Sequence, residues 1–329
     1  MLSCIRRLRF VLLPGALAAC SNLAAQNAGI AEKEIPFPSA NPAGYEEILA
    51  RAPVRAVQLS GRLYLPGGSA AHPVVVITPG SGGVSPSMVR HAQALAGAGT
   101  AVFLIDPFTG RGVKSTVADQ SQFSFAASTY DVLAAAKQLA TFPEVDAARI
   151  GAMGYSRGGT AVLQAAISPL AQTILGEGRT LKAIAAGWPW CGYQFATPAT
   201  APTSVRFLVA EMDDWVSPVQ CQGYAAAMAS TNPNVSIRLF KDALHGFGYG
   251  GPIREIPNAV KALNAPIVYF NRTGAVIDWY TGDSLPGIGE RYLSTQGKAF
   301  FGRGVHTGSA EGQADAYVAD VIAFFKRAL

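Results

Sequence analysis

Short apolar runs rich in β-branched residues alternate along most of the chain with longer stretches whose apolar positions repeat at helical spacing. Continuous apolar runs are typical of parallel strands buried on both faces, and the helices between such strands cover the sheet. The predicted strands are residues 73–78, 100–105, 149–153, 181–186, 205–210 and 235–240. The predicted helices are residues 88–97, 128–142, 160–167, 218–230 and 315–329. The pattern therefore predicts an α/β fold with a mostly parallel central sheet and helices on both faces.

Two regions depart from this alternation. Residues 54–65 alternate loosely around Ser60-Gly61, which predicts an edge hairpin. Residues 247–310 are rich in glycine and contain one apolar run, Ala265–Phe270, so we expect an irregular excursion near the active edge of the sheet. With 329 residues, half of them apolar, the chain can bury one large core, and we expect a single domain over residues 45–329.

Residues 1–20 have the pattern of an export signal. Basic residues at positions 6, 7 and 9 precede an apolar run from Phe10 to Ala19 that is too short to cross a bilayer. The run ends in Leu17-Ala18-Ala19-Cys20, which resembles the lipobox of bacterial lipoproteins, where the cysteine becomes the lipidated first residue of the mature chain. The alternative is an ordinary signal peptide that is cut nearby, for instance after Ala25.

Both alternatives place the mature protein outside the cytoplasm. The serine that follows Cys20 favours the outer membrane for a lipoprotein. Residues 21–44 are polar and contain prolines, so they predict a tether between the membrane and the folded domain.

The formal net charge of +5 does not indicate binding of nucleic acid. Three of the 26 basic residues lie in the leader, which leaves 23 basic residues against 21 acidic ones. No basic stripe interleaved with aromatic residues remains, so we expect no nucleic-acid partner.

The four cysteines divide evenly between the leader and the mature chain. Cys191 and Cys221 are the mature pair, and an exported chain folds in an oxidising compartment. We therefore expect a disulfide between them, with two buried free thiols as the alternative. Neither cysteine has histidines or further cysteines at the spacing of zinc ligands, so we expect no metal site.

Gly154-Tyr155-Ser156-Arg157-Gly158 forms a G-x-S-x-G pattern between the predicted strand 149–153 and an Ala-rich helix. This is the context of a nucleophile elbow, in which a strand turns sharply into a helix and exposes the middle serine. The flanking glycines are needed because a Cβ there would collide with the neighbouring strand or helix. A Gly-rich turn that carries a serine by chance is the alternative, so the assignment of Ser156 depends on its partners.

A serine nucleophile needs a base, and the chain has four histidines. His72 precedes the first central strand at the opposite end of the sheet, and His91 lies inside a helix. His245 follows the strand 235–240 and therefore emerges at the carboxyl edge, where Ser156 also lies. Open α/β sheets build their sites at that edge, so His245 is the predicted base.

The third member of a triad is expected at the end of a strand between these two. Asp213 and Asp214 follow the strand 205–210, and the order Ser, Asp, His is that of α/β-hydrolases. His245 would take the proton of Ser156 during attack on an ester carbonyl, and the carboxylate would orient the imidazole.

Backbone N–H groups beside the nucleophile are expected to bind the oxyanion of the tetrahedral intermediate. One is the N–H of Arg157, which follows the serine, and the other comes from the loop after the first central strand. In that loop Ser81 is the first choice and Gly82 the alternative. We assign Arg157 only its N–H and expect its side chain to point to solvent or to a nearby carboxylate.

Several stretches resemble the dienelactone hydrolase family of the α/β-hydrolase superfamily. The resemblance covers residues 63–248 and the final helix. The stretches that carry it are Pro79–Gly83, Asp106–Gly112, Val145–Gly151, Gly154–Gly159, Asp213–Trp215 and Ala243–Phe247. The resemblance implies an α/β-hydrolase fold and an activity that needs no cofactor. It also implies Asp213 as the triad acid, with Asp214 as second choice, and a Cys191–Cys221 disulfide as in the exported members.

The chain departs from the family pattern at two positions. The namesake enzymes use a cysteine nucleophile, whereas this chain has Ser156, which favours general ester hydrolysis over dienelactone itself. The loop that begins His-Gly in the family begins Pro79-Gly80 here, which leaves the oxyanion geometry open. Asp106 and Arg111 are interpreted as an ion pair that locks a loop under the site, with contact to a substrate carboxylate as the alternative. His306 is expected to be a surface loop residue of the excursion.

Together these observations predict an exported or lipid-anchored serine hydrolase that cleaves small carboxylic esters or lactones through an acyl-enzyme intermediate. A serine peptidase of the same fold is one alternative, but such enzymes usually carry an added propeller or an extensive cap. A binding protein on a hydrolase scaffold is the other, and it predicts erosion of the triad, whose residues are all present. The acyl and alcohol specificity and the oligomeric state stay open.

Overall fold

The structure is a computed structural model, and it describes residues 29–278, 280–292 and 300–329. The predicted leader, residues 1–20, and its candidate lipidation site Cys20 lie outside the described residues. No helix within these three ranges is long and apolar enough to cross a membrane.

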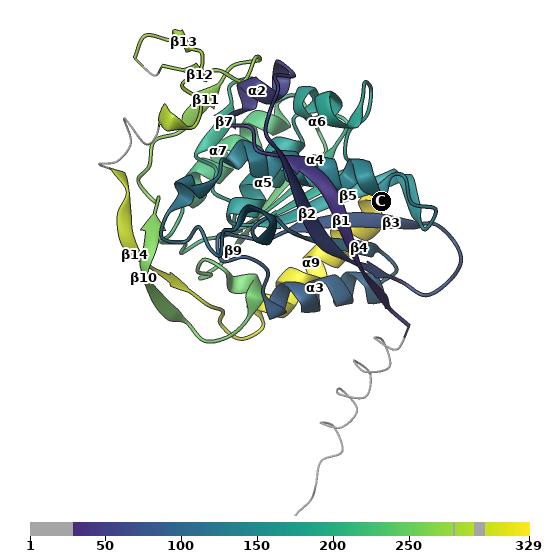
Figure 1. Cartoon of the computed structure of the whole chain (residues 1–329). Coiled ribbons are helices and arrows are strands. Elements are labelled where there is room, and N and C mark those ends of the chain that lie inside the picture. Colours follow the sequence, from purple (N-terminus) through teal and green to yellow (C-terminus); the bar gives the residue numbers. More distant parts are fainter. Residues whose placement is uncertain (1–28, 279, 293–299) are drawn as a thin grey trace, which may run out of the picture.

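An eight-stranded sheet forms the centre of the domain (Figure 1). Strand β2 pairs antiparallel with both of its neighbours, and the other pairs are parallel, which confirms the predicted mostly parallel sheet. In order across the sheet, the strands are β1 (Ala31–Ala40), β2 (Ala56–Leu65), β4 (Ala101–Asp106), β3 (His72–Thr78), β5 (Val145–Tyr155), β6 (Ala183–Gly187), β8 (Ser204–Ala210) and β9 (Val235–Phe240).

Helices cover both faces of this sheet, as the apolar runs of the strands predict. One apolar cluster joins the sheet to α4, α5, α6 and α7, and it includes Leu133, Val162 and Met228. A second cluster joins the other face to α3 and α9, through side chains such as Leu95 and Phe325. The helices are α2 (Tyr45–Leu49), α3 (Pro86–Gly97), α4 (Phe125–Leu139), α5 (Arg157–Ala165), α6 (Ser168–Leu175), α7 (Pro218–Ala229) and α9 (Gln313–Ala328).

Strand β1 occupies part of the segment for which the sequence predicted a tether, residues 21–44. Its prolines disfavour a central strand, but an edge strand tolerates them, and β1 is at the edge of the sheet. Ile35 and Phe37 are buried while Pro36 and Pro38 face outward, so the segment alternates like a half-buried strand. The folded domain therefore begins earlier than residue 45.

The hairpin predicted for residues 54–65 is wrong, because β2 is one continuous strand between β1 and β4. Gly61 lies in the middle of this strand rather than in a turn. A Cβ at Gly61 would come within 2.7 Å of the ring of Phe103 on β4. The glycine therefore makes room for an aromatic ring on the neighbouring strand.

The excursion over residues 247–310 contains short strands that belong to two small sheets. Strand β10 (Arg254–Lys261) pairs with β14 (Gly302–Thr307) in an arm that runs along one side of the domain in Figure 1. The other small sheet joins β7 (Tyr193–Phe195), which lies outside the excursion, to β11 (Val268–Phe270), β12 (Val276–Ile277) and β13 (Ser284–Leu285).

Candidate active site

Ser156 lies at the sharp turn between strand β5 and helix α5. The strand ends at Tyr155 and the helix begins at Arg157, which leaves Ser156 with φ of 52° and ψ of −115°. A positive φ is strained for a residue that carries a Cβ, and such strain collects at functional turns. The backbone N–H of Ser156 donates to the carbonyl of Gly187 on β6 at 2.9 Å, which holds the turn in place.

The glycines around this turn are required by close packing. A Cβ on Gly154 would overlap the carbonyl group of Gly158, and a Cβ on Gly158 would come within 2.6 Å of the carbonyl oxygen of Thr78. A Cβ on Gly80 would lie 3.3 Å from the Cβ of Ser156. The loop after β3 therefore passes directly against the serine, as the nucleophile-elbow pattern predicts.

Ser156, His245 and Asp213 form a continuous chain of hydrogen bonds. Nε2 of His245 lies 2.9 Å from Oγ of Ser156, and Nδ1 of His245 lies 2.8 Å from Oδ2 of Asp213. The other carboxylate oxygen of Asp213 accepts the N–H groups of Trp215 at 2.9 Å and Val216 at 3.0 Å. His245 and Asp213 are both buried, so water is largely excluded from their contact.

Asp214, the second choice for the triad acid, points to a different histidine. Its Oδ1 accepts the backbone N–H of His306 at 2.9 Å, and its Oδ2 lies 2.8 Å from Nδ1 of His306. His306 lies on strand β14 of the arm, where its side chain is about half exposed. His306 is thus a surface residue of the excursion, as predicted, but it lies on a strand rather than in a loop, and the sequence carries no signal for its pairing with Asp214.

The two residues predicted to supply oxyanion donors both line the cavity that contains Ser156. The N–H groups of Ser81 and Arg157 donate to no protein acceptor among the residues that the structure describes. The carbonyl of Ser81 accepts the N–H of Thr116 at 2.8 Å and the hydroxyl of Ser115 at 3.1 Å, so its loop is held from the far side. Both N–H groups are therefore free for a ligand.

The side chain of Arg157 is buried rather than directed to solvent, and among the described residues no carboxylate lies within ion-pair distance of it. Its guanidinium donates to the backbone and side-chain oxygens of Gln120 and to the carbonyl of Phe123. It also packs over the rings of Phe123 and Phe125, at 4.4 and 4.1 Å from their centroids. Burial lowers the pKa of Arg157 to about 10, so the group keeps its charge at neutral pH.

A cavity of about 680 Å³ opens beside Ser156. Aromatic side chains form much of its wall, including Phe125, Trp190, Tyr193 and Trp215. This volume and this apolar lining are typical of small-molecule sites.

Glu290, from the excursion, also lines this cavity. Its carboxylate accepts the first two N–H groups of helix α4, those of Phe125 and Ala126, each at 2.7 Å. Burial raises the pKa of Glu290 to about 7, against the opposing effect of these hydrogen bonds and of Arg157. The sequence carries no signal for this residue, because its partner helix lies more than 150 positions earlier in the chain.

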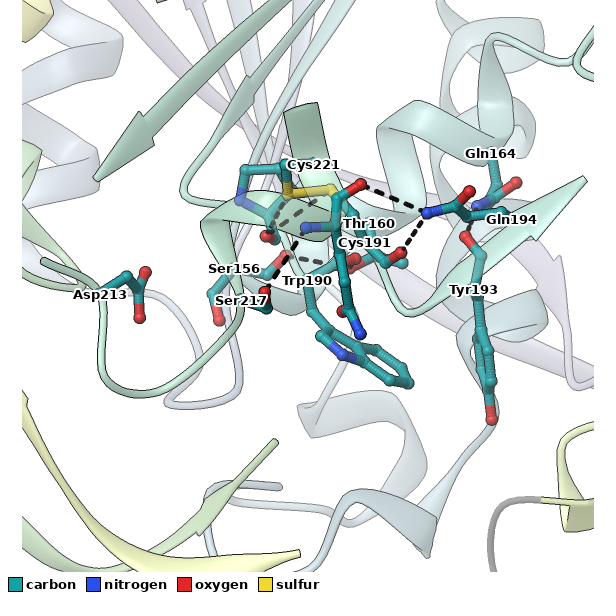
Figure 2. The surroundings of a disulfide bond; sticks show 12 residues. Ser156, Thr160, Gln164, Trp190, Cys191, Tyr193, Gln194, Asp213, Ser217 and Cys221 are labelled. Carbon is teal, nitrogen blue, oxygen red and sulfur yellow. Dashed lines mark hydrogen bonds between the residues drawn. A yellow bond between two sulfur atoms is a disulfide. The ribbon is translucent and has the colours of Figure 1, made fainter. Parts of the chain in front are cut away.

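Cys191 and Cys221 are joined in a disulfide, which lies close to Trp190 and Thr160 (Figure 2). The bridge links the loop after β6 to helix α7. The hydroxyl of Thr160 on α5 donates to the carbonyl of Trp190 at 2.6 Å. The disulfide and this hydrogen bond together hold the Trp190 wall of the cavity against two helices.

The remaining candidates lie away from the cavity. His72 begins β3, and His91 on α3 is buried with Nδ1 at 2.7 Å from the hydroxyl of Tyr155. The predicted ion pair between Arg111 and Asp106 is not formed. The two terminal nitrogens of Arg111 instead donate to the buried carboxylate of Asp131 at 2.8 Å each.

Asp106 accepts the N–H groups of Phe108 and Thr109 in its own loop. Neither Asp106 nor Arg111 lines the described cavity, so neither is placed to contact a substrate carboxylate. No group of His, Cys, Asp or Glu among the described residues is arranged to hold a metal ion.

Comparison with known protein families identifies a match over most of the folded domain. The family model of the dienelactone hydrolase family matches residues 59–273. The chain belongs to the dienelactone hydrolase family. As a member of that family it is a hydrolase of esters or lactones in the α/β-hydrolase superfamily. No curated protein was found to match this chain.

Solved structures share the dienelactone hydrolase-like α/β fold. A dienelactone hydrolase-like promiscuous phosphotriesterase from metagenomic libraries is 15% identical, with a TM-score of 0.54 over 92% of this chain and 99% of its own. The structure named m3DLH is 18% identical, with a TM-score of 0.55 over 92% of this chain and all of its own. At this identity the likeness shows the fold alone.

Proposed function

We propose that the protein is a serine hydrolase that cleaves carboxylic esters or lactones through a Ser156–His245–Asp213 triad and an acyl-enzyme intermediate. The observation that carries the proposal is the unbroken hydrogen-bond chain from Ser156 Oγ through His245 to Asp213. The strained turn at Ser156 and the cavity beside it support the same assignment. Serine, base and orienting acid at these distances are the signature of an activated nucleophile.

In the acylation half, Nε2 of His245 accepts the proton of Ser156 as Oγ attacks the carbonyl carbon of the ester. A C–O bond forms to the serine, and the carbonyl electron pair moves onto the oxygen. Asp213 holds the Nδ1–H of the imidazole, so Nε2 is free to accept, and its charge stabilises the imidazolium. The imidazolium then protonates the leaving alkoxide as the ester C–O bond breaks, which leaves the acyl group on Ser156.

Deacylation repeats these steps with water as the nucleophile. His245 takes a proton from the water, the hydroxide attacks the acyl carbon, and Ser156 leaves with the proton that His245 returns. The free N–H groups of Ser81 and Arg157 bind the oxyanion in both halves. Such preorganised donors stabilise charge that develops only in the transition state, which lowers the barrier without tightening substrate binding.

Export to the cell envelope, with a lipid at Cys20, is part of the proposal. The Cys191–Cys221 disulfide supports it, because structural disulfides persist in oxidising compartments. Metabolic labelling with a palmitate analogue followed by fractionation tests it. Label in the membrane fraction that is lost in Cys20→Ala supports a lipoprotein. Secretion without label supports an ordinary signal peptide, and a protein retained in the cytoplasm contradicts export.

The triad is tested with p-nitrophenyl esters of short to medium acyl chains and a fluorophosphonate probe. We expect the wild type to turn over at least one ester, and we expect Ser156→Ala and His245→Ala to lose that activity. His72→Ala is the matched control, because His72 lies at the opposite end of the sheet and should leave activity unchanged. Mass spectrometry should find the probe on Ser156.

Other outcomes of this experiment distinguish between a different substrate class and a protein that is not a hydrolase. Labelled Ser156 without ester turnover would point to lactones or peptides as substrates. An unlabelled and inactive wild type would contradict the hydrolase and favour a binding protein on the same scaffold.

A further inference from the structure

The side chain of Gln120 connects the two residues that carry the free N–H groups. Its Nε2 donates to the hydroxyl of Ser81 at 3.0 Å, and that hydroxyl lies 3.3 Å from Oε1 of the same amide. Oε1 also accepts a hydrogen bond from the Arg157 guanidinium at 3.0 Å. One amide group therefore spans the distance between the β3 loop and the start of helix α5.

The loop that carries Gln120 is held at both ends by hydrogen bonds from other parts of the chain. Its backbone carbonyl accepts from Arg157 at 3.2 Å, and the carbonyl of Phe123 accepts from the same guanidinium. On the other side, Arg303 of the arm donates to the carbonyl of Ala118 at 2.9 Å. The 3₁₀ turn Gln120–Gln122 is thus fixed to Arg157 and to the excursion, and it offers Ser81 a rigid anchor.

The backbone around Ser81 is already constrained on both sides. The carbonyl of Gly80 accepts the N–H of Gly83 at 3.1 Å, and the carbonyl of Ser81 accepts from Thr116 and Ser115. In a trans peptide the N–H points opposite to the preceding carbonyl, so the bond at Gly80 sets the direction of the Ser81 N–H. These bonds set the direction of the Ser81 N–H, and the Gln120 amide joins the Ser81 hydroxyl to the guanidinium of Arg157.

We propose that Gln120 is a positioning residue that fixes the separation of the two oxyanion donors. The inference rests on the proposed function, because it concerns the same serine hydrolase site. An oxyanion donor works only when it lies about 2.7–3.1 Å from the position that the oxyanion will occupy. Loss of the Gln120 amide lets the Ser81 loop move relative to helix α5, so one donor leaves that range.

The alternative is that Gln120 merely stabilises its loop. The two roles differ in what they change. A stabilising role lowers the melting temperature and spreads its effect over kcat and KM, whereas a positioning role lowers kcat and leaves KM nearly unchanged. A positioning role also weakens a transition-state analogue, such as a boronic acid, by the same factor as kcat.

The experiment uses Gln120→Met, which preserves side-chain volume and removes both hydrogen bonds, and Ser81→Ala, which keeps the backbone N–H and removes the hydroxyl. With a p-nitrophenyl ester that the wild type hydrolyses, we expect each variant to lower kcat about tenfold, less than removal of a donor outright. We expect KM to change less than about twofold and boronic acid affinity to fall with kcat. The kcat of the double variant should be no lower than that of either single variant, because both changes break the same hydrogen bond between Gln120 and Ser81.

Gln222→Met is the matched control, because it makes the same exchange on the exposed surface of helix α7. Gln222 does not line the cavity beside Ser156. We expect its kcat to stay within about twofold of the wild type. An equal loss in this control, additive losses in the double variant, or an unchanged kcat in Gln120→Met overturns the inference. Failure of the proposed function looks different, because the wild type would then be as inactive as Ser156→Ala.

Discussion

The central sheet and the excursion (residues 247–310) both reach the candidate site, but they contribute to it in different ways. Ser156, Asp213 and His245 follow strands β5, β8 and β9, so the sheet supplies every member of the triad. The excursion supplies none of them and instead forms hydrogen bonds to the loops that carry Asp213 and His245. The hydroxyl of Thr307 donates to the carbonyl of His245 at 2.7 Å.

Two further contacts of the excursion hold the loop after Asp213. The indole N–H of Trp215 donates to the carbonyl of Val260 at 2.9 Å, and the N–H of Ala262 donates to the carbonyl of Trp215 at 2.9 Å. The central strands β3 and β6 are almost fully buried, whereas Ala259 is the one buried residue of β10, so the arm is expected to open at lower free energy than the centre of the sheet. The sheet therefore determines which residues react, and the excursion determines how firmly the loops of Asp213 and His245 are held.

The sharpest test of this division compares Asp213 with Asp214. Asp213 belongs to the sheet side and contacts His245, while Asp214 contacts His306 of the excursion. We expect Asp213→Asn to lower kcat about 10⁴-fold, because the amide cannot stabilise the imidazolium and favours the wrong tautomer. Asp214→Asn should lower kcat less than about threefold, since it weakens only a partly exposed contact.

Steady-state kinetics with the same ester measures both effects. Both changes preserve side-chain size, so we expect both variants to fold, and circular dichroism checks this. If Asp214→Asn were the inactive variant, the assignment of the triad acid would be reversed.

The disulfide links two elements on the sheet side, the loop after β6 and helix α7. Cys191 and Cys221 are 30 positions apart, so the bridge restricts the unfolded chain. Replacing both by alanine should lower the free energy of unfolding by about 3 kcal/mol. Urea denaturation measures this change, and reduced wild type provides the control. A double variant as stable as the oxidised wild type would contradict the prediction.

The two regions also carry buried groups with opposite pH dependence. Burial lowers the pKa of His91, on the sheet side, from 6.5 to about 4. Between these values the unfolded chain binds more protons, so the free energy of unfolding falls as the pH falls, by about 3 kcal/mol. Burial raises the pKa of Glu290, in the excursion, from 4.5 to about 7. There the folded chain holds the proton, so the free energy of unfolding falls as the pH rises through this window.

Urea denaturation between about pH 4 and pH 8 separates the two effects. The two windows overlap between about pH 4.5 and 6.5, where the opposing effects largely cancel in the wild type, so the variants carry the test. We expect the free energy of unfolding of His91→Gln to fall as the pH rises and that of Glu290→Ala to fall as the pH falls. A profile unchanged in one variant would contradict the assignment of that residue.

The sheet was largely predictable from the sequence, and the physical reason is its repetition. The run predicted as strand 73–78 lies within β3, because a strand buried on both faces needs a continuous apolar run. Segment 31–40 escaped prediction because its prolines suit only an edge strand, and the sequence does not show which strand lies at the edge.

The site was predictable in its reactive residues but not in their supports. The order of the predicted strands is enough to identify Ser156 and His245. Asp213 and Asp214 both come after strand β8, and they differ only in the histidine that each one contacts. Gln120 and Thr307 bond through an amide and a hydroxyl to residues far away in the chain. A lone polar residue in a loop carries no periodic signal, so only the folded structure reveals such supports.

The smallest expected effect tests the hold of the excursion on His245. Thr307→Val keeps the shape of the side chain and removes the hydrogen bond to the carbonyl of His245. Loss of one such bond costs about 1 kcal/mol, so we expect kcat/KM to fall about fivefold, with the melting temperature lowered only slightly. Thr281→Val is the matched control, because Thr281 lies in an exposed turn of the same excursion, at Asp278. Equal effects in both variants would mean that the excursion acts on stability alone, whereas a loss confined to Thr307→Val shows that it positions the base.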